Sequence, residues 1–336
     1  MGLGVVGLFA LLAAKRRRSL KTGTAACVAV TAAVLSAQAV TIDQTMTNPP
    51  AGTDWNQSSV WGDNLVVPTD DYNMIPGPTR IGQSFTTQGF AWAYYGQVRD
   101  STTTSIFEGG KLLINDATRL LMKAIDDVDA TSTADIVLNG GHILSAPNSG
   151  GTVNLAGTIN LVAPLGAIGM NPSGSSTLTF NIDSTITGSG QLQLVQTGSA
   201  GSVSLLNVRG DISNFAGEFY LSSSEGIAPG PLSAFSFASA SAPLATLNLA
   251  TFTTNFHFDL NSELSFGSVI LDGSELDPGI YTFADLEARA PGKFLSNGGS
   301  ITVLAAVPEP SVVVALLAGA GFFAVVMRRK TAGFKA

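Results

Sequence analysis

The residues Gly151-Thr-Val-Asn-Leu-Ala156 are followed at once by Gly157-Thr-Ile-Asn-Leu-Val162, a second copy in which only aliphatic positions change. Within each copy apolar and polar side chains alternate, which is the period of a β-strand with one buried face. Each copy begins with glycine, a residue that readily makes turns. Repeated short strands are typical of a solenoid, in which each coil buries its apolar row against its neighbours. The stretch therefore predicts two short strands of a β-solenoid.

Runs with the same alternation recur along the chain, each bounded by Gly, Asn, Ser or Pro. Between Ala134 and Leu304 no segment of ten or more residues has the 3.6-residue apolar period of a helix. The predicted fold class is therefore all-β, with a parallel β-helix favoured and a jelly roll or another sandwich as the alternative. We expect strands at residues 136–139, 152–156, 158–162, 177–182, 191–195, 202–208, 218–221, 246–249, 255–260, 263–271 and 300–304.

One segment carries a more specific pattern. The residues Ile186-Thr-Gly188-Ser-Gly190-Gln-Leu192-Gln-Leu194, with Asn214-Phe215-Ala-Gly217 after them, resemble the autotransporter-associated β-strand repeats of bacterial surface proteins. The resemblance covers one clear unit, residues 186–222. It implies a right-handed parallel β-helix and says little about activity. From the residues themselves we expect Gly188 and Gly190 to allow positive φ or a crowded corner. The side chains expected to point inward are Leu192, Leu194, Leu205 and Phe215.

The C-terminus has three features in order: Pro308-Glu309-Pro310, an uncharged apolar run at residues 311–327, and the basic cluster Arg328, Arg329 and Lys330. The run is about 25 Å long as a helix, near the lower limit for spanning a bilayer, and the positive-inside rule keeps the basic cluster in the cytoplasm. This order resembles the PEP-CTERM sorting domain of Gram-negative bacteria. The resemblance implies recognition and cleavage by an exosortase, a membrane-embedded cysteine transpeptidase. We therefore expect residues 307–336 to be a sorting signal with a transient inner-membrane anchor.

The N-terminus has the pattern of a secretory signal. Basic residues from Lys15 to Lys21 precede an apolar stretch at residues 24–35, and Ala37-Gln-Ala39 supplies the small residues of a signal-peptidase site. We expect residues 1–39 to form the signal peptide and the mature chain to begin near Val40. The apolar segment before Lys15 leaves the true start codon open. The two ends together predict export to the cell surface or the extracellular matrix.

Removing both ends leaves an acidic body. Of the 17 Lys and Arg residues, five lie at residues 15–21 and four at residues 328–335, whereas 23 of the 24 acidic residues lie between the ends, so the body carries about −15. This charge argues against a nucleic-acid partner and against binding of anionic lipid or anionic polysaccharide by charge. The single cysteine, Cys27, lies in the signal region, which excludes disulfides and thiolate metal sites from the mature chain.

Residues 40–130 differ in composition from the predicted solenoid body at residues 131–306. They contain all three tryptophans, Trp55, Trp61 and Trp92. One interpretation is an aromatic platform on which the rings of an extracellular polysaccharide stack. The favoured interpretation is a cap that hides the last apolar row of the solenoid from water. Residues 111–127 fit either a short helix or two strands that form the first rungs.

The sequence offers few groups for catalysis. His142 and His257 are the only histidines, and no nearby spacing suggests a metal site or a catalytic triad around either. Asp70-Asp71 and Asp126-Asp127 lack the spacing of calcium-binding loops. We therefore expect no catalytic residue, metal or cofactor. The favoured function is a non-enzymatic surface or matrix protein; a glycan-binding adhesin and, less favoured, a polysaccharide-degrading β-helix enzyme are the alternatives.

Overall fold

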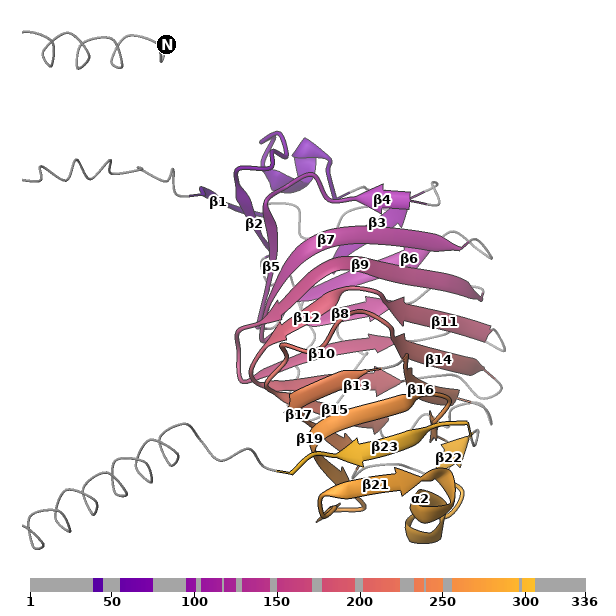
Figure 1. Cartoon of the computed structure of the whole chain (residues 1–336). Coiled ribbons are helices and arrows are strands. Elements are labelled where there is room, and N and C mark those ends of the chain that lie inside the picture. Colours follow the sequence, from indigo (N-terminus) through magenta and orange to yellow (C-terminus); the bar gives the residue numbers. More distant parts are fainter. Residues whose placement is uncertain are drawn as a thin grey trace, which may run out of the picture. The chain divides into compact units, whose positions relative to one another are not determined.

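The described strands form two large sheets in which nearly all neighbours are parallel (Figure 1). Only β19–β20 and β21–β23 pair antiparallel among the described strands. The all-β parallel solenoid is thereby confirmed over the antiparallel jelly roll. The computed structural model describes residues 39–44, 55–74, 95–100, 104–116, 118–124, 129–145, 150–170, 177–196, 202–223, 233–238, 240–249, 256–295 and 298–305.

The first sheet has 12 strands: ten follow one another along its main path, and two short strands pair beside that path. β4 (Thr104–Ile106) pairs with β7, and β12 (Thr185–Gly188) pairs with β9. The main path runs through β1 (Thr41–Asp43), β2 (Asp71–Met74), β5 (Lys111–Asn115), β7 (Ala130–Asn139), β9 (Gly151–Leu161), β11 (Thr177–Ile182), β14 (Val203–Val208), β16 (Ser233–Phe237), β18 (Phe256–Asp259) and β22 (Phe294–Leu295).

Two ladders can be separated within this sheet, because β7 and β9 are 10 and 11 residues long and each pairs with different strands along its two halves. Wall 1 consists of β4, the first halves of β7 and β9, and then β11, β14, β16, β18 and β22. Wall 2 consists of β1, β2, β5, the second halves of β7 and β9, and β12. A single bridge from Gly188 to Phe215 continues wall 2 beyond β12.

The second sheet has 11 strands. The short strand β20 (Ser274–Glu275) pairs with β19 at its C-terminal side. The main path runs through β3 (Tyr95–Asp100), β6 (Arg119–Ala124), β8 (His142–Ser145), β10 (Leu165–Met170), β13 (Gln191–Gln196), β15 (Glu218–Ser223), β17 (Ser241–Leu249), β19 (Glu263–Leu271), β23 (Ser300–Val303) and β21 (Gly279–Thr282). Residues 111–127 thus contribute two strands, β5 and β6, and not a helix. Wall 3 is the ladder of the second sheet from β3 to β15 and on into the second parts of β17 and β19, whereas the first parts of β17 and β19 pair with each other and with β23.

The repeated stretch at residues 151–162 forms one strand, which corrects the prediction of two. Gly157 lies at its middle with φ of 98°, and a Cβ there would lie 2.2 Å from the carbonyl oxygen of Ala134 on the neighbouring coil. The first copy faces β11 and the second faces β12. The glycine therefore carries the ladder from wall 1 into wall 2 without interrupting the strand, because only glycine adopts this φ readily in so small a space.

The predicted corner glycines are confirmed. Gly188 has φ of 102°, and a Cβ on it would lie 2.0 Å from the carbonyl oxygen of Leu161. A Cβ on Gly190 would lie 2.4 Å from the carbonyl oxygen of Ala163, and one on Gly217 would lie 2.0 Å from that of Gly190. Backbone from successive coils thus stacks closely at the corner between walls 2 and 3.

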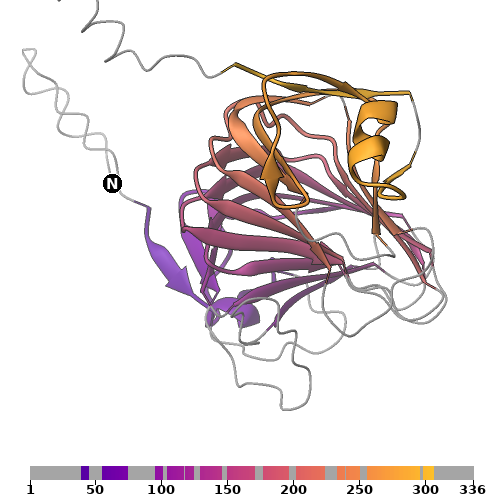
Figure 2. The same ribbon diagram turned by 90° about the horizontal axis from the view of Figure 1, so that it is seen from below.

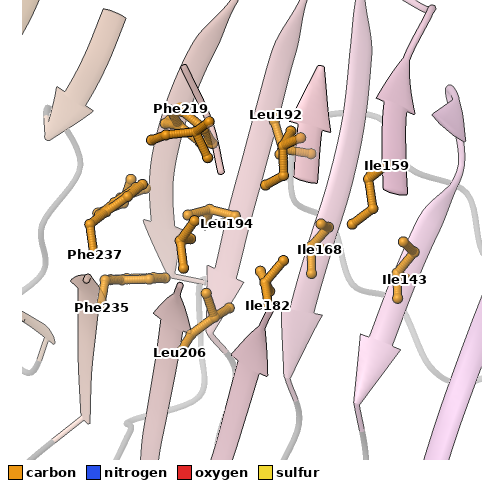
Figure 3. Packing of buried hydrophobic residues seen from close by; sticks show 14 of the residues in the cluster. Ile143, Ile159, Ile168, Ile182, Leu192, Leu194, Leu206, Phe219, Phe235 and Phe237 are labelled. Atoms are coloured by element: carbon orange, nitrogen blue, oxygen red, sulfur yellow. The ribbon is translucent and has the colours of Figure 1, made fainter. Parts of the chain in front are cut away.

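Three of the four predicted inward side chains are in the core. Leu192, Leu194 and Phe215 are fully buried. Leu205 is only half-buried, and its neighbour Leu206 points inward instead. The register explains the correction, because Phe180 pairs with Leu206, which pairs with Phe235, so the inner row passes through Leu206. Figure 3 labels Leu206 and Phe235 of this row, while Ile182 belongs to the next inner row, where it pairs with Val208.

Both ends of the stack are closed by elements outside the parallel ladders. At the N-terminal end the 3-10 helix η1 (Ser58–Trp61) contributes Val60 and Trp61 to the core. At the C-terminal end α2 (Phe283–Arg289) buries Leu286 and begins with a capping box between Thr282 and Asp285. Figure 2 views the body from below, with α2 and β21 at the near end. This helix was missed from the sequence because its 7 residues are too short for a clear apolar period.

Candidate functional site

The residues predicted to direct sorting lie outside the part of the chain that the structure describes. This applies to Pro308, Glu309 and Pro310, to the basic cluster at residues 328–330 and to Ala37, whereas Ala39 lies at the start of the first described segment. No helix among the described residues is long and apolar enough to cross a bilayer. The predicted anchor at residues 311–327 is not among those residues, so the anchor and both cleavage sites stay predictions.

Two of the three tryptophans proposed for glycan stacking are in the core. Trp55 and Trp61 are 4% and 2% exposed. Trp55 packs against Phe107 with ring centroids 5.4 Å apart, and Trp61 packs edge-on against Tyr72 at 5.0 Å. Burial of both rings fits the cap interpretation and weighs against the stacking interpretation, because a sugar ring needs an accessible aromatic face. Trp92 lies outside the described residues.

An asparagine beside this cluster completes the edge of wall 1. The side-chain amide of Asn56 donates to the carbonyl oxygen of Ile106 at 2.7 Å and accepts from the backbone N–H of Glu108 at 2.9 Å. These two groups flank Phe107 on the open side of β4, where a further parallel strand would donate and accept. The amide of Asn56 therefore takes the place of one peptide group of a missing strand.

His142 lies on the outer side of wall 3 and is buried against Arg119 of the preceding coil. Nε of Arg119 donates to Nδ1 of His142 at 3.2 Å, and Nη2 lies 2.9 Å from the same atom. Burial, and secondarily the charge of Arg119, hold the pKa of His142 well below its usual 6.5. The imidazole is therefore neutral at pH 7, with its Nδ1 lone pair occupied by a guanidinium. This arrangement suits a structural contact better than a general base.

The second histidine, His257, is on β18 of wall 1, two residues before Asp259. Partial burial raises the pKa of Asp259, while a hydrogen bond from Asn261 at 3.1 Å opposes that rise. His142 and His257 belong to different walls and to different coils, and the described hydrogen bonds do not join them. No group of three or more His, Cys, Asp or Glu residues in the described part of the chain is arranged to hold a metal ion.

Outward polar side chains form a ladder along wall 1. Asn207 donates to Asn181 at 2.8 Å, Asn181 donates to Asn154 at 2.8 Å, and Asn154 donates to the hydroxyl of Thr131 at 3.2 Å. Ser236 extends the row by donating to Asn207. The partners are 23 to 29 residues apart in sequence, which is one coil of the solenoid. Each bond links neighbouring coils in the same direction.

Wall 2 carries shorter ladders of the same kind. Asn139 donates to Asn115 at 2.7 Å, Asn115 donates to Asn73, and Asn73 donates to Asp43 at 2.8 Å. On the neighbouring strands, Thr158 donates to Asp135 at 2.8 Å and Thr187 donates to Asn160 at 3.3 Å. The outward polar groups of this wall are thus held by one another across the coils. Sequence reasoning missed both sets of ladders.

The three walls differ in how accessible their outer sides are. In the middle coils of wall 1, Asn181 and Ala234 are buried, and in those of wall 3, Gln193 and Val195 are buried. On wall 2 the outward side chains are exposed or half-buried. Those that are exposed include Asp135, Asn139, Thr158, Asn160 and Val162.

The chain matches no known protein family, no curated protein and no solved structure. The resemblances to the PEP-CTERM sorting domain and to the autotransporter-associated repeats therefore rest on the quoted residues. What the structure contributes is the solenoid itself, its closed ends and the difference between its three walls.

Proposed function

We propose that the chain is an exported, non-enzymatic structural protein of the cell surface or extracellular matrix, delivered by a PEP-CTERM/exosortase-type system. The single observation that supports the structural role is the use of outward polar side chains. Asn154, Asn181 and Asn207 hydrogen-bond to one another from coil to coil, and the pair Arg209–Asp183 joins neighbouring coils at 2.7 Å. Side chains committed to such ladders stiffen a scaffold rather than converge on a reacting atom.

The location rests on the residues at the two ends of the sequence. Pro308-Glu309-Pro310, the apolar run and the basic cluster stand in the order expected of a sorting signal that is cut after export. The last described strand, β23, ends at Val303, five positions before Pro308. An extended chain of that length spans less than about 20 Å, so a membrane-bound enzyme would act close to the C-terminal end of the solenoid.

The test replaces Pro308, Glu309 and Pro310 with alanine in the full chain, expressed in a bacterium that has an exosortase. We expect an uncut precursor that stays in the inner membrane, while the wild-type chain is cut and leaves it. The matched control replaces Thr331, Gly333 and Phe334, which lie beyond the basic cluster. Normal cleavage and release of the Pro308–Pro310 variant would refute the sorting proposal, and sugar release by the purified wild-type chain would refute the non-enzymatic one.

A further inference from the structure

Wall 2 has the most accessible outer side of the three walls. Its outward positions lie on consecutive parallel strands, so that Asp135 pairs with Thr158, which pairs with Thr185, and Val137 pairs with Asn160, which pairs with Thr187. Parallel strands recur at about 4.8 Å, so these residues form straight rows along the solenoid axis. The rows combine Thr hydroxyls and the amide of Asn160 with the apolar side chain of Val137, and the exposed Val162 follows directly after β9.

The polar groups in these rows are already held in place. Thr158 is bonded to Asp135, and Thr187 is bonded to Asn160. An amide has two N–H groups and a carbonyl oxygen with two lone pairs, so one hydrogen bond within the row leaves further capacity facing outward. A ligand that binds here does not have to order these side chains, which lowers the entropic cost of binding.

We propose that the outer side of wall 2, over β7, β9 and β12, binds a neutral, linear, hydroxyl-rich glycan that lies along the solenoid axis. The occupant rests on the proposed extracellular location, where polysaccharide is the abundant repeating polymer. Rows that repeat along one axis fit a ligand built of repeating units. Hydroxyls of such a ligand match the amides and Thr hydroxyls, and its C–H faces match Val137 and Val162.

Charge selects a neutral glycan over the other candidates. The body carries about −15, because 23 of 24 acidic residues but only eight of 17 basic residues lie in it. A second copy and an anionic polysaccharide would both be repelled. Within the β7–β9–β12 portion, Asp135 is the carboxylate of the rows, and it already accepts from Thr158. The aromatic cluster at the N-terminal end is a poorer site, because Trp55 and Trp61 are buried.

The experiment titrates the full chain, purified in detergent micelles, with a neutral glucose hexasaccharide and with a uronate hexasaccharide. Asn160→Glu places a carboxylate in the middle of the rows, and Thr187→Val removes one hydroxyl at nearly constant shape. The matched control is Leu244→Glu, which adds the same charge at a position that is 67% exposed and lies on β17. Circular dichroism verifies that each variant keeps its unfolding midpoint, and sedimentation records self-association.

We expect binding of the neutral hexasaccharide, an affinity at least about 10-fold weaker in Asn160→Glu, a few-fold loss in Thr187→Val and no change in Leu244→Glu. Binding of the uronate alone, or an affinity that Asn160→Glu leaves unchanged, would overturn the proposal. So would no binding at about 10 mM ligand. Self-association abolished by Asn160→Glu would make a second copy the occupant. A chain that is still cut and released but binds no glycan loses this inference and keeps the proposed function.

Discussion

Two parts of the solenoid differ in their core. Behind the aromatic cluster of Trp55, Trp61, Tyr72 and Phe107, the buried apolar side chains of residues 111–208 are aliphatic or methionine apart from Phe180, whereas those of residues 215–294 are rich in phenylalanine. On wall 1 one inner row runs from Ile182 through Val208 to Phe237, and Figure 3 labels Ile182 and Phe237. The rings of the second part contact one another, since the ring centroid of Phe237 lies 5.3 Å from that of Phe219 and 5.7 Å from that of Phe266. We call these parts the aliphatic half and the aromatic half.

The difference in core composition accompanies a difference in wall 2. In the aliphatic half, wall 2 has full strands at β5, β7, β9 and β12, and glycines at the corners let the coils approach closely. In the described residues of the aromatic half, the bridge from Gly188 to Phe215 is followed by a shorter ladder, in which the first parts of β17 and β19 pair with each other and with β23. The phenylalanine rings fill the core beside this ladder, in keeping with the close packing that protein interiors require.

The largest effect is expected at the border between the halves. Leu192→Asp places a carboxylate in the core at a fully buried position. An unpaired charge in such a site costs several kcal/mol, so we expect loss of cooperative folding in both halves. The matched control is Leu205→Asp, which lies on the half-buried outer side of β14. Circular dichroism and urea unfolding measure both; a stable Leu192→Asp variant would contradict the assigned core.

Truncation within the core should distinguish the two halves. Phe237→Ala removes a ring that contacts Phe219, Phe258 and Phe266, and we expect it to lower the free energy of unfolding by about 3–5 kcal/mol. Ile182→Val in the aliphatic half removes one methylene and should cost about 0.5–1.5 kcal/mol. Urea denaturation gives both values. Equal losses for the two variants would mean that the ring cluster is not the packing centre of the aromatic half.

The corner glycines test why the aliphatic coils can approach closely. Gly188→Ala combines φ of 102° with a Cβ 2.0 Å from the carbonyl oxygen of Leu161, so we expect a loss of about 1–3 kcal/mol or more. Gly273→Ala is the control, because Gly273 has φ of 77° but no atom within 4 Å of an added Cβ. It should cost about 1 kcal/mol from the backbone alone. Indistinguishable unfolding midpoints would show that crowding at Gly188 relaxes freely.

Acid should affect the two halves in opposite directions, with the smallest change. The pKa of His142 is lowered on folding, so its contribution to stability is fully present above pH 6.5 and declines as the pH falls below that value. The pKa of Asp259 is raised, so its contribution is fully present below 3.8 and is lost as the pH rises through the raised value. Melting temperatures of His142→Asn and Asp259→Asn across pH 3.5 to 8 measure the two slopes.

His257→Asn controls for loss of an imidazole elsewhere. If His142→Asn unfolds with the same dependence on acid as the wild-type chain, the buried contact with Arg119 is not the source of the sensitivity. Likewise, if Asp259→Asn unfolds with the same dependence on pH as the wild-type chain at the acidic end of the pH range, burial of Asp259 is not the source of the change. If each variant loses its expected part of the wild-type pH dependence, the aliphatic and aromatic halves respond to pH in opposite directions.

The inner rows could be predicted where the alternation is unambiguous, as at Leu192 and Leu194. The prediction from alternation fails at Leu205 and Leu206, because two adjacent leucines satisfy either register. Only the pairing across coils decides between them. The single strand β9 was divided in two because Gly157 is typical of a turn, although it serves here as a bend within a strand.

The ladders show a similar limit. Asn154, Asn181 and Asn207 recur at intervals of 27 and 26 residues, a spacing that could have identified them once the coil length was known. The row through Asn73 and Asn115 spans 42 residues because the chain between them is longer, so spacing alone gives no signal. The Arg119–His142 contact and the closing role of Asn56 depend on pairing between distant segments and could not be read from the sequence.

Asn56 has a further consequence for how many copies can join. A sheet edge with free donors and acceptors is a template for another strand, and stacked coils could in principle continue from one molecule into the next. On wall 1 a neighbour would first have to displace the amide that holds Ile106 and Glu108. We therefore expect that copies of the chain do not extend wall 1 by stacking end to end, even at a high local concentration in the membrane before release.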